Sequence, residues 1–397
     1  MQLREDDLRK LREQKWEERL GEPVTVEFRG VTFLRQREDG SCIFWQSDGR
    51  CRIHGEFGLE AKPIACQLFP FSFAPRDDGV QIGLNFACQS VLENKGASLA
   101  SHTTDLRRML ASVPEASREG RPPLLTRRLR AEPREVAALT AVLDGWLART
   151  DLDLATRLDG LAWLVQSLGM ARFDQVRGER FIELIATLVS ALPEELDLVP
   201  FSAAAGRTAR LIRQAAFARI EDVRVGEALA KGRFKSVISQ LLRSRRFARG
   251  RGVAPIGVQG WPREIRFRDV AATRFTVDAK ESEGIDELIS RWLRMTILGG
   301  RAWGPGCYGF PIPEGLQALL VNLLAVGWLA RAHAAGAGRS AAVLVDVRAA
   351  LGRVDRHAGR APWLGSSGEG MRMRYFQTTE AWRGALVETW DDAQSGS

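Results

Sequence analysis

LQALLVNLLAVGWLA, residues 316–330, is an almost uninterrupted apolar run. A bilayer takes about 20 residues to cross, and this run is shorter and contains two polar residues, Gln317 and Asn322. A helix that is apolar on all sides is stable only where other elements cover it. The run therefore predicts the buried core helix of a globular domain and argues against a membrane span.

Helical periodicity continues on both sides of this run. Apolar side chains recur at three- and four-residue spacing, and glycine or proline stands near the segment ends. Helices are predicted over residues 136–149, 152–170, 173–192, 203–220, 234–247, 285–298, 314–334 and 341–357. We expect a helical domain over residues 136–360 and a loosely structured tail over residues 361–397, which Trp382 and Trp390 could dock.

The N-terminal part of the chain has a different pattern. Leucines at roughly helical spacing predict a helix over residues 1–20, and short alternating runs predict strands at 24–28, 31–34, 72–74 and 80–84. Four prolines within residues 113–135 indicate a linker. The predicted fold is α+β and predominantly α: a small cysteine-rich domain with short antiparallel strands over residues 1–112, followed by the larger helical domain.

Composition narrows the class of protein. With 397 residues, 45% hydrophobic and 27% charged, the chain is globular rather than disordered. The residues that follow Met1 are charged rather than apolar, so no signal peptide is expected. We therefore predict a cytoplasmic protein with reduced thiols, and the excess of arginine over lysine is typical of a GC-rich bacterial gene.

Positive charge is concentrated in one stretch. Residues 201–260 contain 13 basic and three acidic side chains, whereas the whole chain has a net charge of +8. Such a field could bind nucleic-acid phosphates. Few aromatic residues accompany it, and a solvated arginine-rich face explains the same pattern. A nucleic-acid-associated helical scaffold is therefore kept as one alternative function.

Four of the five cysteines, Cys42, Cys51, Cys66 and Cys88, fall within 47 residues. Their thiolates are ligands for zinc or iron, although their spacing lacks the tight pairs of most zinc sites, and buried cysteine also serves as a small apolar residue. Lys62 could favour a nearby thiolate. The fifth, Cys307, is expected to be structural, and His54 is a weaker ligand candidate because histidines are more often packed or solvent-facing.

Turn signals set the expected backbone around these cysteines. Asp48-Gly49 predicts a hairpin over residues 41–54, and prolines and glycines predict an irregular loop over 55–75. In a regular hairpin Cys42 and Cys51 would lie roughly 13 Å apart along the strand, too far to share one ion. Either the strand bends near Trp45 or the two cysteines serve different sites.

The order and spacing of these residues resemble a known family. Cys42-Ile43-Phe44, Gly49-Arg50-Cys51-Arg52-Ile53-His54 and Lys62-Pro63-Ile64-Ala65-Cys66 followed by Phe69-Pro70 are similar to the YkgJ-type zinc- or iron-chelating family, also called the CxxCxxCC family. The resemblance covers about residues 1–110. It implies that Cys42, Cys51, Cys66 and Cys88 are metal ligands, with zinc, iron or an iron–sulfur centre as the cofactor.

The resemblance leaves the activity open. The family's CxxCxxCC cluster has no counterpart in this sequence, so either the annotated start lies too late or this member uses fewer ligands. Flagellin lysine N-methylases are similar in combining such a cysteine module with a helical region, which implies protein methylation as an alternative and a protein as substrate or partner. No motif selects catalytic residues, so whether the chain is an enzyme stays undecided.

Overall fold

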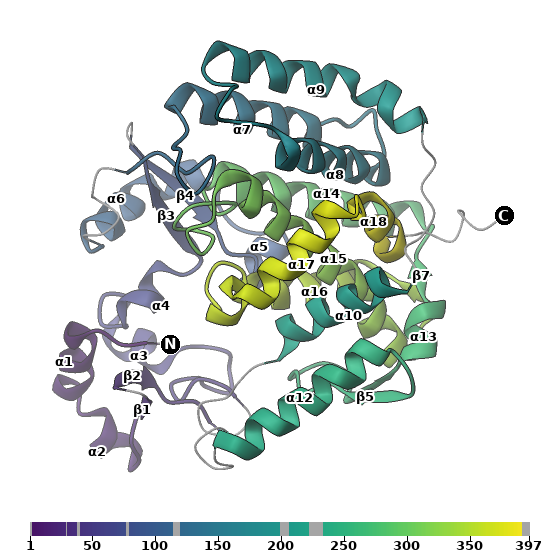
Figure 1. The fold of residues 1–397 in the computed structure, drawn as a ribbon. Helices are drawn as coiled ribbons and strands as arrows, with labels where there is room; N and C mark the ends of the chain where they lie inside the picture. The colour runs from purple at the N-terminus through teal and green to yellow at the C-terminus, as the bar shows by residue number, and fades with distance from the viewer. Residues whose placement is uncertain are drawn as a thin grey trace. The chain divides into compact units, whose positions relative to one another are not determined.

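The chain forms two compact units, each with its own hydrophobic core (Figure 1). The computed structural model describes residues 2–28, 30–37, 40–76, 79–113, 120–198, 206–221 and 233–390. The smaller unit comprises Met1–Phe69, Ser98–Pro114 and Val223–Ile238, and the larger unit comprises Pro70–Ala97, Glu115–Asp222 and Ser239–Ser397. The protein is mostly helical (59%), with short two-stranded antiparallel sheets near the N-terminus, which confirms the predicted fold class.

Short elements make up the smaller unit. Strands β1 (Thr25–Phe28) and β2 (Val31–Leu34) pair antiparallel, with Thr25 opposite Leu34. The helical elements are α1 (Glu5–Glu13), α2 (Trp16–Leu20), α3 (Arg52–Phe57), α4 (Ile64–Leu68), a 3-10 turn η1 (Leu99–His102) and α6 (Thr103–Ala111). Apart from α12 (Arg233–Arg249), whose first residues belong to this unit, none of the helices in its described part exceeds nine residues, so tertiary packing rather than helix propensity must stabilise them.

The predicted N-terminal helix is broken at Lys15. This residue has a left-handed backbone (φ 55°), and it separates α1 from α2. The break turns Trp16 into the core, where its ring meets Phe44 edge-on at 5.0 Å between centroids. Arg19 covers the Trp16 ring at 4.4 Å. The helical spacing was correct for each piece, and burial of one large aromatic ring accounts for the bend between them.

Helix α15 (Ile312–Gly336) is the centre of the larger unit. It contacts the helices α8 (Leu154–Met170), α10 (Arg207–Ile220), α13 (Phe267–Ala272), α16 (Leu344–His357), α17 (Ser367–Thr378) and α18 (Trp382–Trp390). By length and composition it could span a membrane, but 89% of its most apolar window is buried inside the structure. The helix is therefore a core helix, as its sequence predicted.

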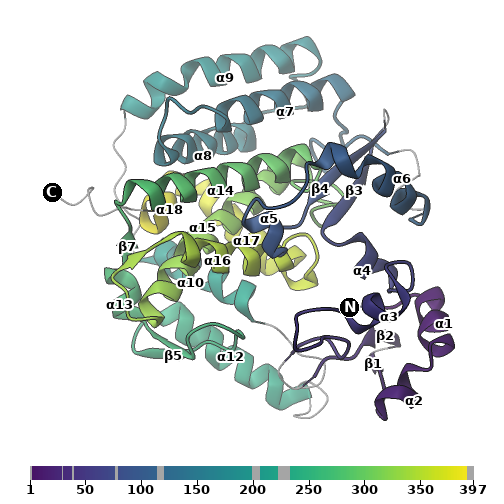
Figure 2. The same ribbon diagram turned by 180° about the vertical axis from the view of Figure 1, so that it is seen from behind.

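Two further helices, α7 (Pro133–Leu147) and α9 (Glu179–Leu198), pack side by side with α8 at one end of the larger unit (Figures 1 and 2). The antiparallel pair β3 (Phe71–Pro75) and β4 (Val80–Leu84) confirms the predicted strands, and β4 packs on α14 (Ala279–Leu298). The remaining elements are α5 (Gln89–Leu92), α12 (Arg233–Arg249), β5 (Val253–Pro255), β6 (Glu264–Arg266), β7 (Arg274–Phe275), β8 (Ala341–Ala342) and η2 (Pro362–Gly365).

Two expectations about connecting segments need correction. The tail is not loose: α17 and α18 occupy it, Trp382 is buried, and Trp390 stacks on Phe275 at 5.0 Å, while residues 391–397 lie outside the described part. Residues 114–119 of the predicted linker also lie outside it, but Leu125 and Ala131 in the rest of that segment are buried in the larger core. In both segments the burial of apolar side chains, rather than the proline and glycine content, determines that the chain packs on the core.

Buried carboxylates tie distant segments of the larger unit together. Asp355 accepts hydrogen bonds from the backbone N–H of Phe86 (2.7 Å), from Trp292 Nε1 (3.1 Å) and from Arg301 (3.1 Å). Glu135, in the first turn of α7, accepts from Arg177 Nε (2.8 Å) and from the backbone N–H of Gly178 (2.7 Å). Each buried charge is thus compensated by several donors.

Candidate metal centre

Three of the four candidate cysteines belong to the smaller unit. Cys42 follows β2 and its backbone forms an isolated antiparallel β-bridge with Gln36. Cys51 is the N-cap of α3, and Cys66 lies inside α4. All three are partly buried and free of disulfides. Cys42 and Cys51 also pack against the hydrophobic cluster of this unit, so the fold holds their backbones in place.

The predicted hairpin over residues 41–54 forms only near its tip, where the backbone N–H of Gln46 donates to the carbonyl of Arg50 (2.9 Å) and that of Arg52 donates to the carbonyl of Phe44 (2.8 Å). The backbone N–H of Trp45 donates to the carbonyl of Cys42 (2.9 Å), and the backbone of Trp45 forms an antiparallel β-bridge with that of Cys51. A tight turn closed by Gln46 and Arg50 then leads directly into α3. The chain therefore bends near Trp45, the first of the two alternatives, and the long separation expected for a straight strand no longer applies.

Cys66 lies in a helix where the sequence predicted an irregular loop. Pro63 stands immediately before α4, and its fixed φ suits a helix start. The backbone N–H of Cys66 donates to the carbonyl of Pro63 (2.8 Å). Prolines at 63 and 70 bound the helix rather than prevent it, which is why a rule based on proline content gave the wrong element.

Asp7 fixes the start of this helix. Its carboxylate is only 3% exposed and accepts hydrogen bonds from the backbone N–H groups of Ile64 (2.8 Å) and Arg4 (3.0 Å). One carboxylate thereby joins the starts of α1 and α4, and Cys66 lies two residues after Ile64, within the first turn of α4. Sequence reasoning missed Asp7, because its partner Ile64 is 57 residues away and no local pattern marks the pair.

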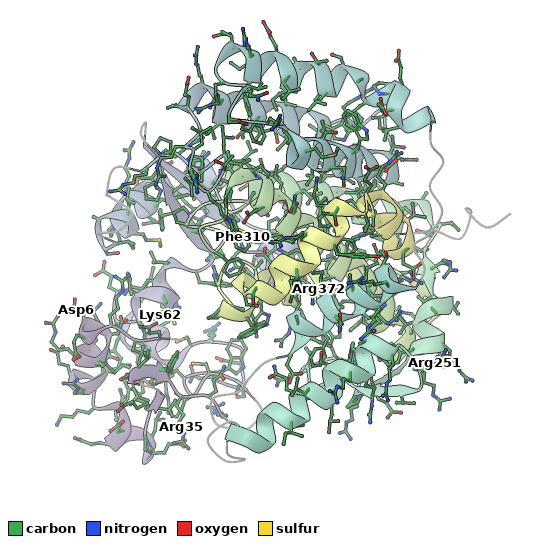
Figure 3. The ribbon with its side chains drawn as sticks, viewed as in Figure 1. Asp6, Arg35, Lys62, Arg251, Phe310 and Arg372 are labelled. Atoms are coloured by element: carbon green, nitrogen blue, oxygen red, sulfur yellow. The ribbon has the colours of Figure 1, made fainter. Side chains whose placement is uncertain are left out.

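The three thiols interact electrostatically. Burial raises the pKa of Cys66 to about 11, Lys62 opposes this rise, and negative charge at Cys42, Cys51 and Asp7 adds to it. Burial also raises the pKa of Cys42; the backbone N–H of Phe44 lowers it and charge on Cys51 raises it further. The predicted effect of Lys62 is confirmed in sign, and Figure 3 labels this residue just before α4. A partly buried cluster of thiols therefore resists ionisation unless a cation compensates it.

The described residues do not form a finished metal cage. Among them, no group of three or more histidine, cysteine, aspartate or glutamate side chains has a geometry that could hold a metal ion. His54 is exposed on α3. The donor chemistry suits zinc or iron, since thiolates are ligands of both, but the side chains would have to move together to bind an ion.

Cys88 and Cys307 belong to the larger unit. Cys88 is the N-cap of α5 and is partly buried. Cys307 is 6% exposed within the larger core, and its burial raises its pKa to about 12. Cys307 therefore has the surroundings of a structural cysteine, as expected, and the candidate centre of the smaller unit consists of Cys42, Cys51 and Cys66.

Comparison with known proteins adds no relative to this description. The chain matches no family model, no curated protein and no solved structure.

Proposed function

We propose that the smaller unit is a thiolate metal-binding module in which Cys42, Cys51 and Cys66 bind zinc or iron. The observation that carries the proposal is that three thiols from separate segments of the chain interact electrostatically, and that two of them, Cys42 and Cys51, pack against one hydrophobic cluster. Thiolates brought together repel each other, and a bound cation reverses the sign of that interaction. When bound, the metal supplies a cross-link between these segments.

The size of the core supports a structural role for the ion. The hydrophobic cluster of the smaller unit contains eight buried side chains, and its helices are short. Small domains of this kind commonly require a metal or disulfides in addition to their apolar core. Metal binding also contributes directly to folding free energy, because the unfolded chain has no preformed site.

The side chains around the thiols have separable roles in the proposal. Asp7 positions the start of α4, and so the backbone that carries Cys66. Lys62 favours the thiolate form of Cys66. The turn around Trp45 orients Cys42 relative to Cys51. Closure of the site then requires the thiol side chains to move together, and the ion and a fourth ligand complete the coordination.

Elemental analysis of the full-length protein, purified without a tag, tests the proposal. We expect near-stoichiometric zinc or iron, and we expect Cys66→Ser to lose most of it. Cys307→Ala removes a thiol outside the proposed site and is the matched control. Full metal retention in Cys66→Ser, or a wild-type protein that is folded and metal-free, would contradict the proposal.

A further inference from the structure

A basic groove in the larger unit lies apart from the thiols. It is formed by the N-terminal part of α10 and the C-terminal part of α12, and its volume is about 940 Å³. Five arginines line it: Arg207, Arg210, Arg213, Arg245 and Arg249. None of the described residues that line it is acidic. The sequence placed these arginines in one basic stretch, and the fold brings them together from two helices.

Arg213 differs from the other four in its role. Its guanidinium donates to the carbonyl oxygens of Phe247 and Ala248, both at 3.1 Å, at the C-terminal end of α12. Burial lowers its pKa. At the other end of the contact, Arg243 pairs with Glu221, so the two helices run antiparallel. Arg213 therefore holds the groove together, and at least two of its five N–H donors are used in doing so.

The other four arginines line the groove and are exposed to solvent. Arg207 and Arg210 are three residues apart on α10, and Arg245 and Arg249 are four apart on α12, so each pair lies on one helix face. Arg207 also stacks on Tyr375 at 4.8 Å, which limits its freedom. Two rows of guanidinium groups thus face one hollow without a lining carboxylate to neutralise them.

This arrangement fits phosphate. Guanidinium groups bind phosphate oxygens through paired hydrogen bonds, and they do so best where no carboxylate competes. The positive charge also extends beyond the groove, since Arg246 and Arg251 are exposed at the same end of α12, and Figure 3 labels Arg251 there. A single phosphate would not need so long a strip of charge, whereas a polymer would.

We propose that the groove between α10 and α12 binds the phosphodiester backbone of a nucleic acid. None of its described lining residues is aromatic, so it has no platform for base stacking, and recognition is independent of base sequence. Leu241 and Leu242 on α12 are exposed, which would suit an anionic lipid surface, but the arginines line a hollow, and a hollow fits a strand better than a flat bilayer.

Fluorescence anisotropy with labelled single-stranded and double-stranded oligonucleotides of mixed sequence tests this proposal. We expect wild-type protein to bind at low salt and to lose affinity steeply as salt rises. The double substitution Arg210→Gln with Arg245→Gln should weaken binding by about tenfold or more, because two charge-assisted hydrogen bonds to phosphate are lost. For single strands it should reduce the salt slope by about 1.4, at ~0.7 for each phosphate contact.

Arg172→Gln with Arg180→Gln is the matched control, since it removes the same charge from exposed positions outside the groove and should leave affinity unchanged. Circular dichroism checks that both variants are folded. Absence of wild-type binding at low salt, or unchanged affinity in the groove variant, would overturn the proposal. Equal competition by poly-glutamate, or binding to anionic vesicles without binding to oligonucleotides, would overturn it as well.

Discussion

The two units are stabilised on different scales. The hydrophobic cluster of the smaller one contains eight buried apolar side chains, Trp16 among them, and the longest helix that lies wholly within its described part has nine residues. The larger one surrounds a 25-residue core helix, α15, with helices on several sides. Its core is large enough to include buried ion pairs such as Arg219–Glu369, at 2.7 Å with both side chains 2% exposed.

This contrast shows in which unit a bound metal ion would contribute most to stability. A large core tolerates buried charges because apolar burial elsewhere outweighs their desolvation. A small core has no such reserve, so one cross-link among Cys42, Cys51 and Cys66 would decide whether the unit stays folded. The same chain therefore contains one unit whose stability is set by packing and, on our proposal, one whose stability is set by metal.

Metal removal should produce the largest difference between the units. Under reducing conditions a chelator should abolish hydrogen-exchange protection in residues 2–69, because structural zinc contributes about 10–16 kcal/mol of binding free energy in zinc-finger peptides. Protection in α7, α8 and α14 should remain. Alkylation should then label Cys42, Cys51 and Cys66 while Cys307 stays unreactive in its core. Equal protection of both units before and after chelation would refute the contrast.

The next effect concerns Glu135 in the larger unit. Glu135→Ala should cost about 3–5 kcal/mol, because Arg177 loses its buried carboxylate partner and the backbone N–H groups of Gly178 and Glu132 lose their acceptor. Urea unfolding at neutral pH measures this loss. Glu179→Gln, which changes a 74%-exposed carboxylate, is the control and should have no measurable effect. A Glu135→Ala protein as stable as wild type would show that the larger unit is stabilised by apolar packing without a contribution from this carboxylate.

Acid should remove the same contribution from the wild-type protein. Burial raises the pKa of Glu135, but hydrogen bonds from Arg177 and from the backbone N–H groups of Glu132 and Gly178 outweigh it and leave the pKa lowered. Its stabilisation is therefore complete above the unfolded-state value of about 4.3 and is lost as pH falls through the lower folded-state value. The stability difference between wild type and Glu135→Ala should shrink over that range.

A smaller effect is expected for Asp7 in the smaller unit. Asp7→Ala should lower the free energy of unfolding by about 1–3 kcal/mol, because two backbone N–H groups lose their acceptor. It should also weaken metal binding by about 10–100-fold, the range typical of groups that position a ligand. Competition with a zinc-sensitive dye measures the affinity. Asp6→Ala is the control, since Asp6, which Figure 3 labels at α1, is 78% exposed and pairs with Arg9 on the same helix. Equal behaviour of the two variants would remove Asp7 from the site.

Sequence patterns predicted the helices of the larger unit well. The helix expected over residues 152–170 is α8, Leu154–Met170, and the apolar run at 316–330 is the middle of α15. Periodicity succeeds here because one face, or the whole circumference, of each helix is buried. The prediction for the tail was wrong because its glycines and serines suggested a loop. Trp382 and Phe376 are buried in the core and hold this segment in place.

The candidate site was less predictable. Cysteine spacing pointed to Cys42, Cys51, Cys66 and Cys88, but it could not foresee that Cys88 belongs to the larger unit. The segment before Cys88 joins that unit because β4 packs on α14, far along the chain. Asp7 was invisible for the same reason. Local rules describe neighbours in sequence, and these positions are defined by partners dozens to hundreds of residues away.

Asp355 has a hydrogen-bond partner very far from it in the sequence. Its carboxylate accepts a hydrogen bond from the backbone N–H of Phe86, 269 residues earlier in the chain. The ribosome must add all of those residues before the segment that follows β4 can meet its acceptor, so these early strands leave the exit tunnel long before their surroundings exist. Completion of the larger unit thus belongs to the end of translation, however early its first strands are made.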